Sequence, residues 1–147
     1  MIASYRLGDK SSANVYINQG LQLDKMNAGL YDNAATLFGL DGKVDDAIKK
    51  YNRALGINAR DVDIYANFAT LLYNHQRFWE AIRILDDAVA KCPMPARAYY
   101  LRALMYNDKG KKNLSIENYK KYLEIALPND SRLAEVRSAL KQLEKTN

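Results

Sequence analysis

The sequence predicts an all-α fold, a superhelix of antiparallel helix pairs with a capping helix at its C-terminal end. Three observations predict it: residue types recur every 34 positions, each copy carries helical stripes of apolar residues, and a short polar turn divides each copy. Recurrence at a fixed step of this length is typical of helical repeat arrays. The recurring residues are Ala13, Ala47, Ala81 and Ser115; Ile17, Tyr51, Leu85 and Tyr119; Gly20, Ala54, Ala88 and Tyr122; and Tyr31, Tyr65 and Tyr99.

Each copy begins with one helix that has a single apolar face. In the first complete copy Tyr31, Ala34, Ala35 and Phe38 fall at i, i+3, i+4 and i+7, a spacing that places them on one side of a helix. The third copy keeps this stripe, although Arg102 interrupts it. The predicted first helices are 28–41, 62–75 and 96–109.

A second helix follows a polar turn in each copy. Turns this short require the two helices to lie antiparallel. Pro93 and Pro128 stop the second helices of the last two copies, because proline cannot continue a helix. The turns are Asp41-Gly42-Lys43, His75-Gln76-Arg77 and Lys109-Gly110-Lys111. The predicted second helices are 44–57, 78–91 and 112–126.

The two ends of the chain depart from the repeat. Residues 1–27 match the loop and second helix of a copy whose first helix is reduced to 1–7, so we expect an open apolar end there. At the other end 129–147 predicts a polar-backed capping helix. Its possible N-caps are Asn129, Asp130 and Ser131, and its apolar stripe is Leu133, Val136, Leu140 and Leu143.

The repeat resembles the tetratricopeptide repeat. In the first complete copy Tyr31, Ala35, Phe38, Gly42 and Ala47 match the family pattern in order, and the later copies match nearly as well. The departures are Gln76 for Gly, Ala59 for Pro, and Tyr122 for Ala, which we expect to loosen the packing against the final helix. The resemblance implies one domain over 1–147, with a partial repeat at 1–27, complete repeats at 28–61, 62–95 and 96–128, and the capping helix at 129–147.

The sequence offers no chemistry that points to an enzyme. Cys92 precedes Pro93 at a helix end, where the negative partial charge disfavours a thiolate, and a small buried hydrophobe is the expected role. His75, the one histidine, lies in a turn, and one His with one Cys does not make a zinc site. We therefore expect no catalytic residue, no metal and no cofactor.

The family resemblance implies that the first helices line a concave surface. The residues predicted to contact a partner there are Asn33, Thr36, Asn67, Thr70, Tyr73, Asn74, Arg97, Tyr100, Leu104 and Asn107. Asparagine amides can donate to and accept from a peptide backbone, and Tyr73 and Tyr100 can serve as apolar anchors.

One family subtype binds acidic carboxyl termini through a clamp of Lys, Asn and Arg. At the corresponding places this sequence has Asp32, Thr36, Asn67, Arg97 and Leu101. Only Asn67 matches fully, and Asp32 would repel a carboxylate. A partner of that kind is not expected.

The resemblance implies a protein-binding scaffold or adaptor whose partner is a protein or peptide segment. Self-association through the N-terminal end, as in a bacterial complex such as a pilus-biogenesis machine, is the alternative; the stretch Tyr65–Ala81 loosely resembles that group. Binding of nucleic acid or of a membrane surface is a weaker alternative. It rests on residues 96–147, which hold 11 Lys+Arg against 6 Asp+Glu, a balance of +5 that equals the net charge of the whole chain. Neither nucleic-acid binding nor membrane insertion is expected.

We expect a cytoplasmic protein; a periplasmic or membrane-attached location stays open if the chain is part of a longer protein.

Overall fold

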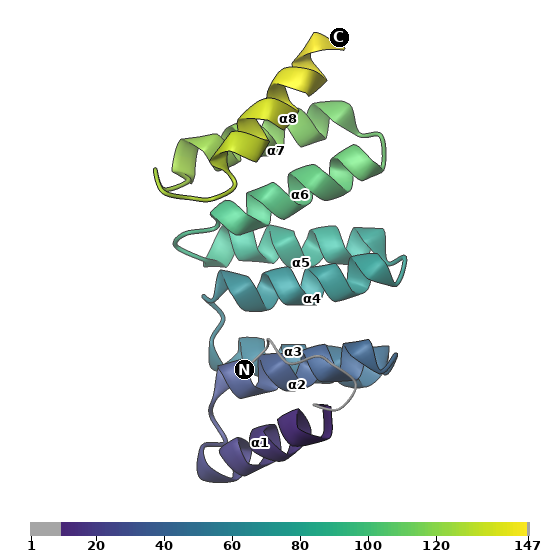
Figure 1. Cartoon of the computed structure of the whole chain (residues 1–147), viewed down its shortest axis with the longest axis vertical. Coiled ribbons are helices and arrows are strands. Elements are labelled where there is room, and N and C mark those ends of the chain that lie inside the picture. The colour runs from purple at the N-terminus through teal and green to yellow at the C-terminus, as the bar shows by residue number, and fades with distance from the viewer. Residues whose placement is uncertain (1–9, 147) are drawn as a thin grey trace.

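The computed structural model describes residues 10–146, and within them the chain forms eight α-helices and no strand. The all-α prediction is confirmed (Figure 1). The predicted helix at 1–7 lies outside the described residues. The helices are α1 Lys10–Leu23, α2 Ala28–Leu40, α3 Val44–Ile57, α4 Val62–Asn74, α5 Phe78–Lys91, α6 Ala96–Asp108, α7 Lys112–Ile125 and α8 Leu133–Lys145.

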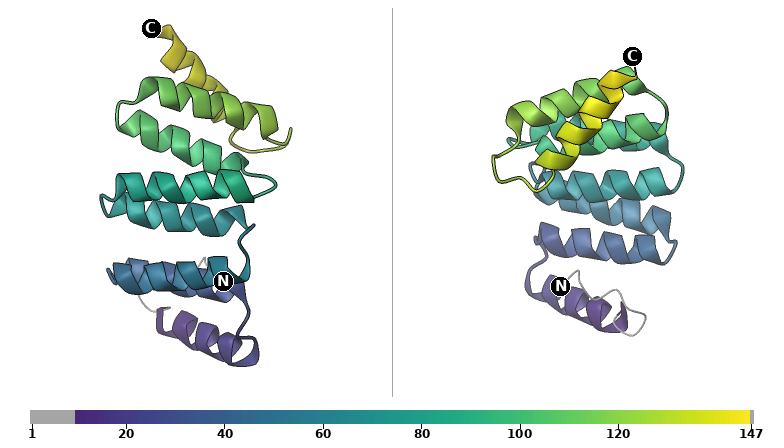
Figure 2. Two further views of the ribbon diagram at one scale, coloured as in Figure 1. Left: turned by 180° about the vertical axis from the view of Figure 1, so that it is seen from behind. Right: turned by 45° about the horizontal axis from the view of Figure 1, so that its top comes forward.

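The helices stack one above another along the long axis of the molecule, from α1 at one end to α8 at the other (Figures 1 and 2). The closest packing is within the pairs α2–α3, α4–α5 and α6–α7, and contacts between neighbouring pairs are sparser. Each of these pairs falls inside one of the predicted repeats. The result is an elongated superhelix, as the 34-residue period predicts.

Three equivalent turns close the pairs in the same way. Gly42, Gln76 and Gly110 have φ angles of 76°, 63° and 72°. After α2, the Lys43 N–H donates to the Phe38 carbonyl at 2.9 Å and the Gly42 N–H to the Gly39 carbonyl at 3.1 Å, and the other two turns repeat both bonds. This is the Schellman motif, in which a left-handed residue satisfies the last helix carbonyls. Gln76 adopts that conformation without being a glycine.

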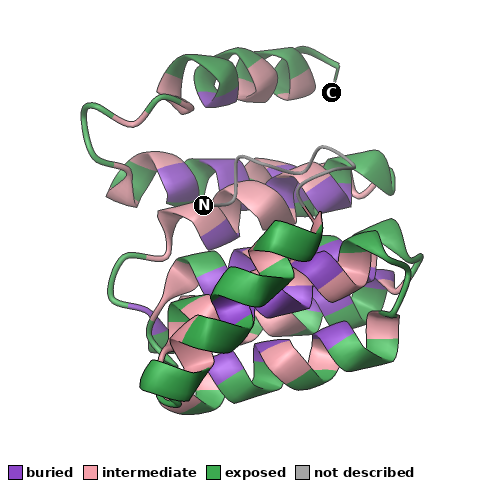
Figure 3. Cartoon of the chain, turned by 60° about the horizontal axis from the view of Figure 1, so that its bottom comes forward, coloured by how far each residue is buried: buried purple, intermediate pink, exposed green. Residues whose placement is uncertain are grey.

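Small residues at the crossing of each pair let the backbones approach. The side chains at these positions have no exposed surface, and in the last pair the Ser115 hydroxyl donates to the Ala103 carbonyl at 2.8 Å. Figure 3 shows buried residues gathered on the faces that the helices turn toward one another. The Tyr51 and Phe68 rings stack between the first two complete pairs, with centroids 5.0 Å apart. The small residues are Ala35, Ala47, Ala69, Ala81, Ala103 and Ser115.

The C-terminal helix α8 covers the last pair. Val136 is fully buried in one cluster with Tyr122, and Leu133, Leu140 and Leu143 pack against that cluster. The expectation that Tyr122 loosens this packing is wrong, since its side chain has no exposed surface. Tyr122 instead packs with Val136 of α8 in one buried cluster, and α8 lies at a different inclination from the repeat helices (Figure 1).

The start of α8 also differs from the expected capping. Its N-cap residue is Arg132, whose side chain makes no capping bond. Asp130 lies two residues before Arg132, and its carboxylate accepts the backbone N–H of Arg132 at 2.9 Å and the side-chain Nε–H at 3.1 Å. These bonds to the Arg132 side chain and backbone lower the pKa of Asp130 to about 2.

Candidate functional site

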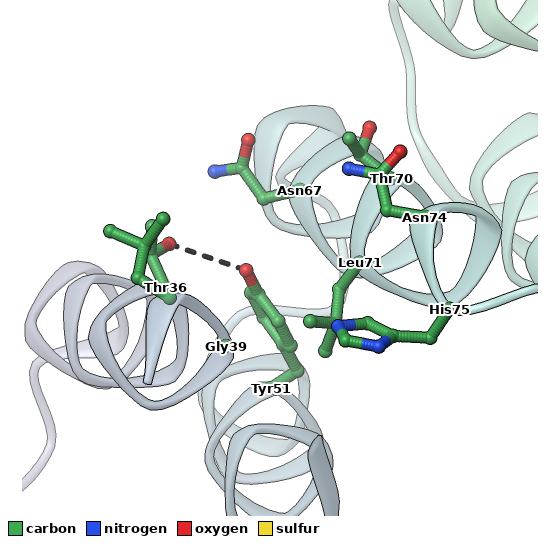
Figure 4. Close-up of a pocket in the computed structure, with 9 residues that line it drawn as sticks. Thr36, Gly39, Tyr51, Asn67, Thr70, Leu71, Asn74 and His75 are labelled. Atoms are coloured by element: carbon green, nitrogen blue, oxygen red, sulfur yellow. Dashed lines mark hydrogen bonds between the residues drawn. The ribbon is translucent and has the colours of Figure 1, made fainter. Parts of the chain in front are cut away.

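The face formed by α2, α4 and α6 carries two adjoining hollows, which we call the groove. The first lies between α2 and α4 and has a volume of about 260 Å³. Figure 4 shows Thr36 and Tyr51 on one side of it and Asn67, Thr70 and Asn74 on the other. The Thr36 and Tyr51 hydroxyls are 3.2 Å apart, within hydrogen-bond distance. The first hollow therefore combines apolar walls with hydroxyl and amide groups.

The second hollow lies between α4 and α6 and is larger, at about 460 Å³. Thr70 lines both hollows, so they adjoin along the face. Apolar side chains make up most of the lining, and an amide and a carboxylate stand among them. The lining residues are Thr70, Tyr73, Leu101, Leu104, Met105, Asn107 and Asp108.

The groove includes seven of the ten residues predicted from the sequence. Thr36, Asn67 and Asn74 line the first hollow, Thr70 lines both, and the second contains Tyr73, Leu104 and Asn107. Three predicted residues line neither hollow: Asn33, Arg97 and Tyr100.

Side chains of successive helices are bonded to one another across this face. The Asn67 amide donates to both Asp32 oxygens, at 3.1 and 3.2 Å. The Tyr73 hydroxyl donates to the Asp108 carboxylate. The sequence predicts that Asn67 and Tyr73 face a partner, but each is bonded inside the chain. The spacing of 35 residues in both pairs is a signal that could have been found.

Two of the three predicted residues outside the hollows make links of the same kind. Arg97 donates to Asp63 at 2.7 Å, and the Tyr100 hydroxyl donates to Glu135 of α8 at 2.7 Å. Burial, with the Glu135 carboxylate beside it, raises the pKa of Tyr100 to about 12. Arg97 and Tyr100 thus tie neighbouring helices together at the side of the groove.

Asp32 is buried beneath the groove, with only 8% of its surface exposed. Burial raises its pKa, and the bond from Asn67 opposes that rise by stabilising the carboxylate. A buried charge with one amide partner favours a fixed position. Asp32 therefore holds Asn67 against α2 at the wall of the first hollow.

The nucleophile and base candidates occupy structural positions. Cys92 is buried at the C-terminal cap of α5, and burial raises the pKa of its thiol, which lowers the thiolate fraction. His75 caps α4 and lies exposed at the edge of the first hollow. Among residues 10–146 no three His, Cys, Asp or Glu side chains lie close enough to hold a metal ion.

No helix in the described part of the chain has the length and apolar character to cross a membrane.

Paired antiparallel helices repeated along one axis, with a hollowed face built by the first helix of each pair, define a helical repeat scaffold. Tetratricopeptide repeat models match residues 40–105 and 96–129, and the chain belongs to the tetratricopeptide repeat family. Proteins with this family's repeats serve generally in protein–protein interaction, and the family and fold are generally non-catalytic.

Solved structures with the same fold include three named proteins. A structure of pilF from Pseudomonas aeruginosa has a TM-score of 0.75 and 21% identity, covering 95% of this chain and 62% of that one. MamA has a TM-score of 0.71 and 20% identity, covering 95% of this chain and 79% of its own. The first TPR of Spaghetti (RPAP3), bound to the HSP90 peptide SRMEEVD, has a TM-score of 0.65 and 21% identity, with coverage of 84% and 94%. Likeness at this identity shows the fold.

A curated relative is the transcription factor tau 131 kDa subunit of Saccharomyces cerevisiae. It is 20% identical over 113 residues, which are 77% of this chain and 11% of that protein. This chain thus corresponds to a small part of that relative.

Proposed function

We propose that the chain is a non-catalytic scaffold that holds an extended segment of a partner protein in the groove. The observation that carries this proposal is that the two hollows adjoin at Thr70 on one face. Packed helices lie roughly 8–10 Å apart, and an extended chain rises about 3.3 Å per residue. About three residues of an extended partner would therefore span the distance between the two hollows.

Exposed amides support this mode of binding. Asn74 and Asn107 lie exposed in the first and second hollow respectively. An extended segment has unpaired backbone N–H and C=O groups, and a carboxamide can satisfy one of each. The amides would hold the partner backbone while the hollows receive its side chains.

The test is to fill the groove without touching the bonds between helices. Thr70→Trp places a large uncharged side chain where the hollows meet, at an exposed helix position. We expect capture of partners by the immobilised chain from its source lysate to fall at least tenfold. Asn52→Trp is the matched control, because Asn52 is exposed on α3 and lines neither hollow. Equal capture by both variants, each with an unchanged melting temperature, would rule the groove out.

Self-association through α1 is a second candidate that a separate observation favours. Val15 and Tyr16 are 51% and 61% exposed on α1. They line a hollow of about 410 Å³ together with Ser11, Ser12 and Gln19. Exposed apolar side chains grouped in this way favour association. Sedimentation at rising concentration should show dimers that Tyr16→Glu abolishes; a chain that stays monomeric at the highest concentration contradicts this candidate.

The narrower functions expected from the sequence receive less support. Likeness to pilF at 21% identity shows a shared fold, so a role in pilus assembly stays a prediction. For nucleic acid or a membrane surface, the basic C-terminal region is the basis. Lys120 and Lys121 there lie near Glu144 and Glu124, at 3.3 and 3.5 Å, and these pairs reduce the available positive charge.

A further inference from the structure

The second hollow has the character of a pocket for one large apolar side chain. Leu101, Leu104 and Met105 of α6 form an apolar lining, and the Tyr73 ring of α4 stands across from them. Asn107 and Asp108 are exposed in the same lining, at the last turn of α6. An apolar side chain that entered this hollow would bring the groups beside it close to a carboxylate.

The charge on the groove is opposite in sign to the charge on the chain as a whole. The net charge of the chain is +5. Around the groove, however, the three aspartates Asp32, Asp63 and Asp108 stand against two cations, Arg97 and Lys109, and Arg97 is paired with Asp63. Asp32 is buried. Asp108 is therefore the exposed carboxylate that a ligand in the second hollow would meet.

The wall beside Asp108 already attracts a cation of the chain. The Lys109 ammonium lies 5.7 Å from the centroid of the Tyr73 ring and 5.8 Å from that of Phe78. Aromatic faces attract cations in this way, and the Tyr73 hydroxyl is bonded to Asp108. Lys109 already occupies this aromatic wall, so a Lys or Arg side chain of the ligand would pair with the Asp108 carboxylate and not with the rings.

An acidic terminus fits this groove poorly. Asn67, the one full match to the family's carboxylate clamp, gives its amide hydrogens to Asp32. A carboxylate placed there would meet the Asp32 charge.

We propose that the partner segment is a basic and apolar peptide, in which a large apolar side chain enters the second hollow and an adjacent Lys or Arg pairs with Asp108. This inference rests on the proposed function, since it assumes that the groove holds the partner. It assigns to the groove a ligand class opposite in charge to an acidic carboxyl-terminal tail.

The experiment is a selection of random twelve-residue peptides on the immobilised full chain. We expect enriched sequences to carry a large apolar residue beside Lys or Arg. An enriched peptide is then labelled with fluorescein and its affinity measured by anisotropy, together with two altered versions, apolar residue to alanine and basic residue to glutamate. Both changes should weaken binding, and added NaCl should weaken binding of the unaltered peptide.

Two variants of the chain locate the contacts. Leu104→Asp puts a charge into the apolar pocket and should weaken binding at least tenfold. Asp108→Asn removes the charge of the exposed carboxylate and keeps a side-chain oxygen that can accept from the Tyr73 hydroxyl. It should weaken binding of the unaltered peptide about two- to fivefold, the range for an exposed ion pair. It should not change the affinity for a peptide whose basic residue is replaced by glutamine. Circular dichroism establishes that each variant is folded; if Leu104→Asp is not, the Asp108→Asn comparison decides.

Enrichment of acidic or carboxylate-terminated peptides that Thr70→Trp releases would overturn the ligand class while the proposed function stands. Peptides that bind Thr70→Trp as tightly as the unaltered chain would overturn both. A selection without any enriched sequence, or an Asp108→Asn effect independent of the basic residue, also overturns this inference.

Discussion

Replacing Gln76 by glycine should stabilise the protein. Gln76 has a φ of 63°, in the left-handed region that Gly42 and Gly110 occupy at the equivalent turns. That region costs a residue with a Cβ roughly 1–2 kcal/mol, while glycine loses about 0.5–1 kcal/mol more conformational freedom on folding. The net gain should be about 0.5–1 kcal/mol. The bond from the Gln76 N–H to the Tyr73 carbonyl, 3.1 Å, does not depend on the side chain.

The assay is thermal and urea unfolding followed by circular dichroism. A gain of this size should raise the melting temperature by about 1–4 °C for a chain of this length. Gln76→Ala is the matched control, since it removes the rest of the side chain but keeps the Cβ, and it should bring no gain. Gly110→Gln should lower stability by a similar amount. If Gln76→Gly and Gln76→Ala unfold at the same temperature, backbone strain at this turn is not the cause and the reasoning fails.

Three further changes test other parts of the structure. Asp32→Asn should be more stable than the unaltered protein at pH 7, because the raised pKa of Asp32 lowers stability as pH rises through it; the advantage should vanish in urea unfolding below about pH 4. Asp130→Asn should destabilise by about 1–2 kcal/mol at pH 7. That loss should disappear as pH falls through about 2, the pKa of Asp130, and a pH-independent loss would contradict it. Tyr65→Phe removes the 2.8 Å bond to the Ala59 carbonyl, and urea unfolding should register a loss of about 1 kcal/mol.

The helices could be predicted well from the sequence because the 34-residue period and the apolar stripes both reflect the same repeated helix pair. A residue that recurs every 34 positions must repeat its surroundings, so the range of each helix follows from the others. The predicted range 112–126 ends one residue beyond α7, and the turns fall where polar residues interrupt the stripes. The left-handed conformation of Gln76 could be inferred from its register with Gly42 and Gly110.

The groove was harder to predict, because helix position reports which way a side chain faces but not which group it meets. Tyr100 faces the predicted side, yet its hydroxyl is bonded to Glu135 of α8. The inclination of α8 is not encoded in the repeat period. Asp32 is similar: nothing in its own copy indicates that Asn67 of the next copy will cover it. Contacts between copies depend on two unlike residues, and a repeat pattern records only what the copies share.

The side-chain bonds between successive copies limit how the repeats could be rearranged. Copies of a repeat are usually considered exchangeable units, but each of these bonds joins a residue of one copy to a different residue of the next. If 62–95 and 96–128 exchanged places, the buried Asp32 would face Leu101 in place of Asn67, and its carboxylate would have no amide donor. If 62–95 were duplicated, the Asn67 of the inserted copy would face Ala66. The copies therefore resemble one another in backbone and core, but the bonds between them depend on the order in which they stand.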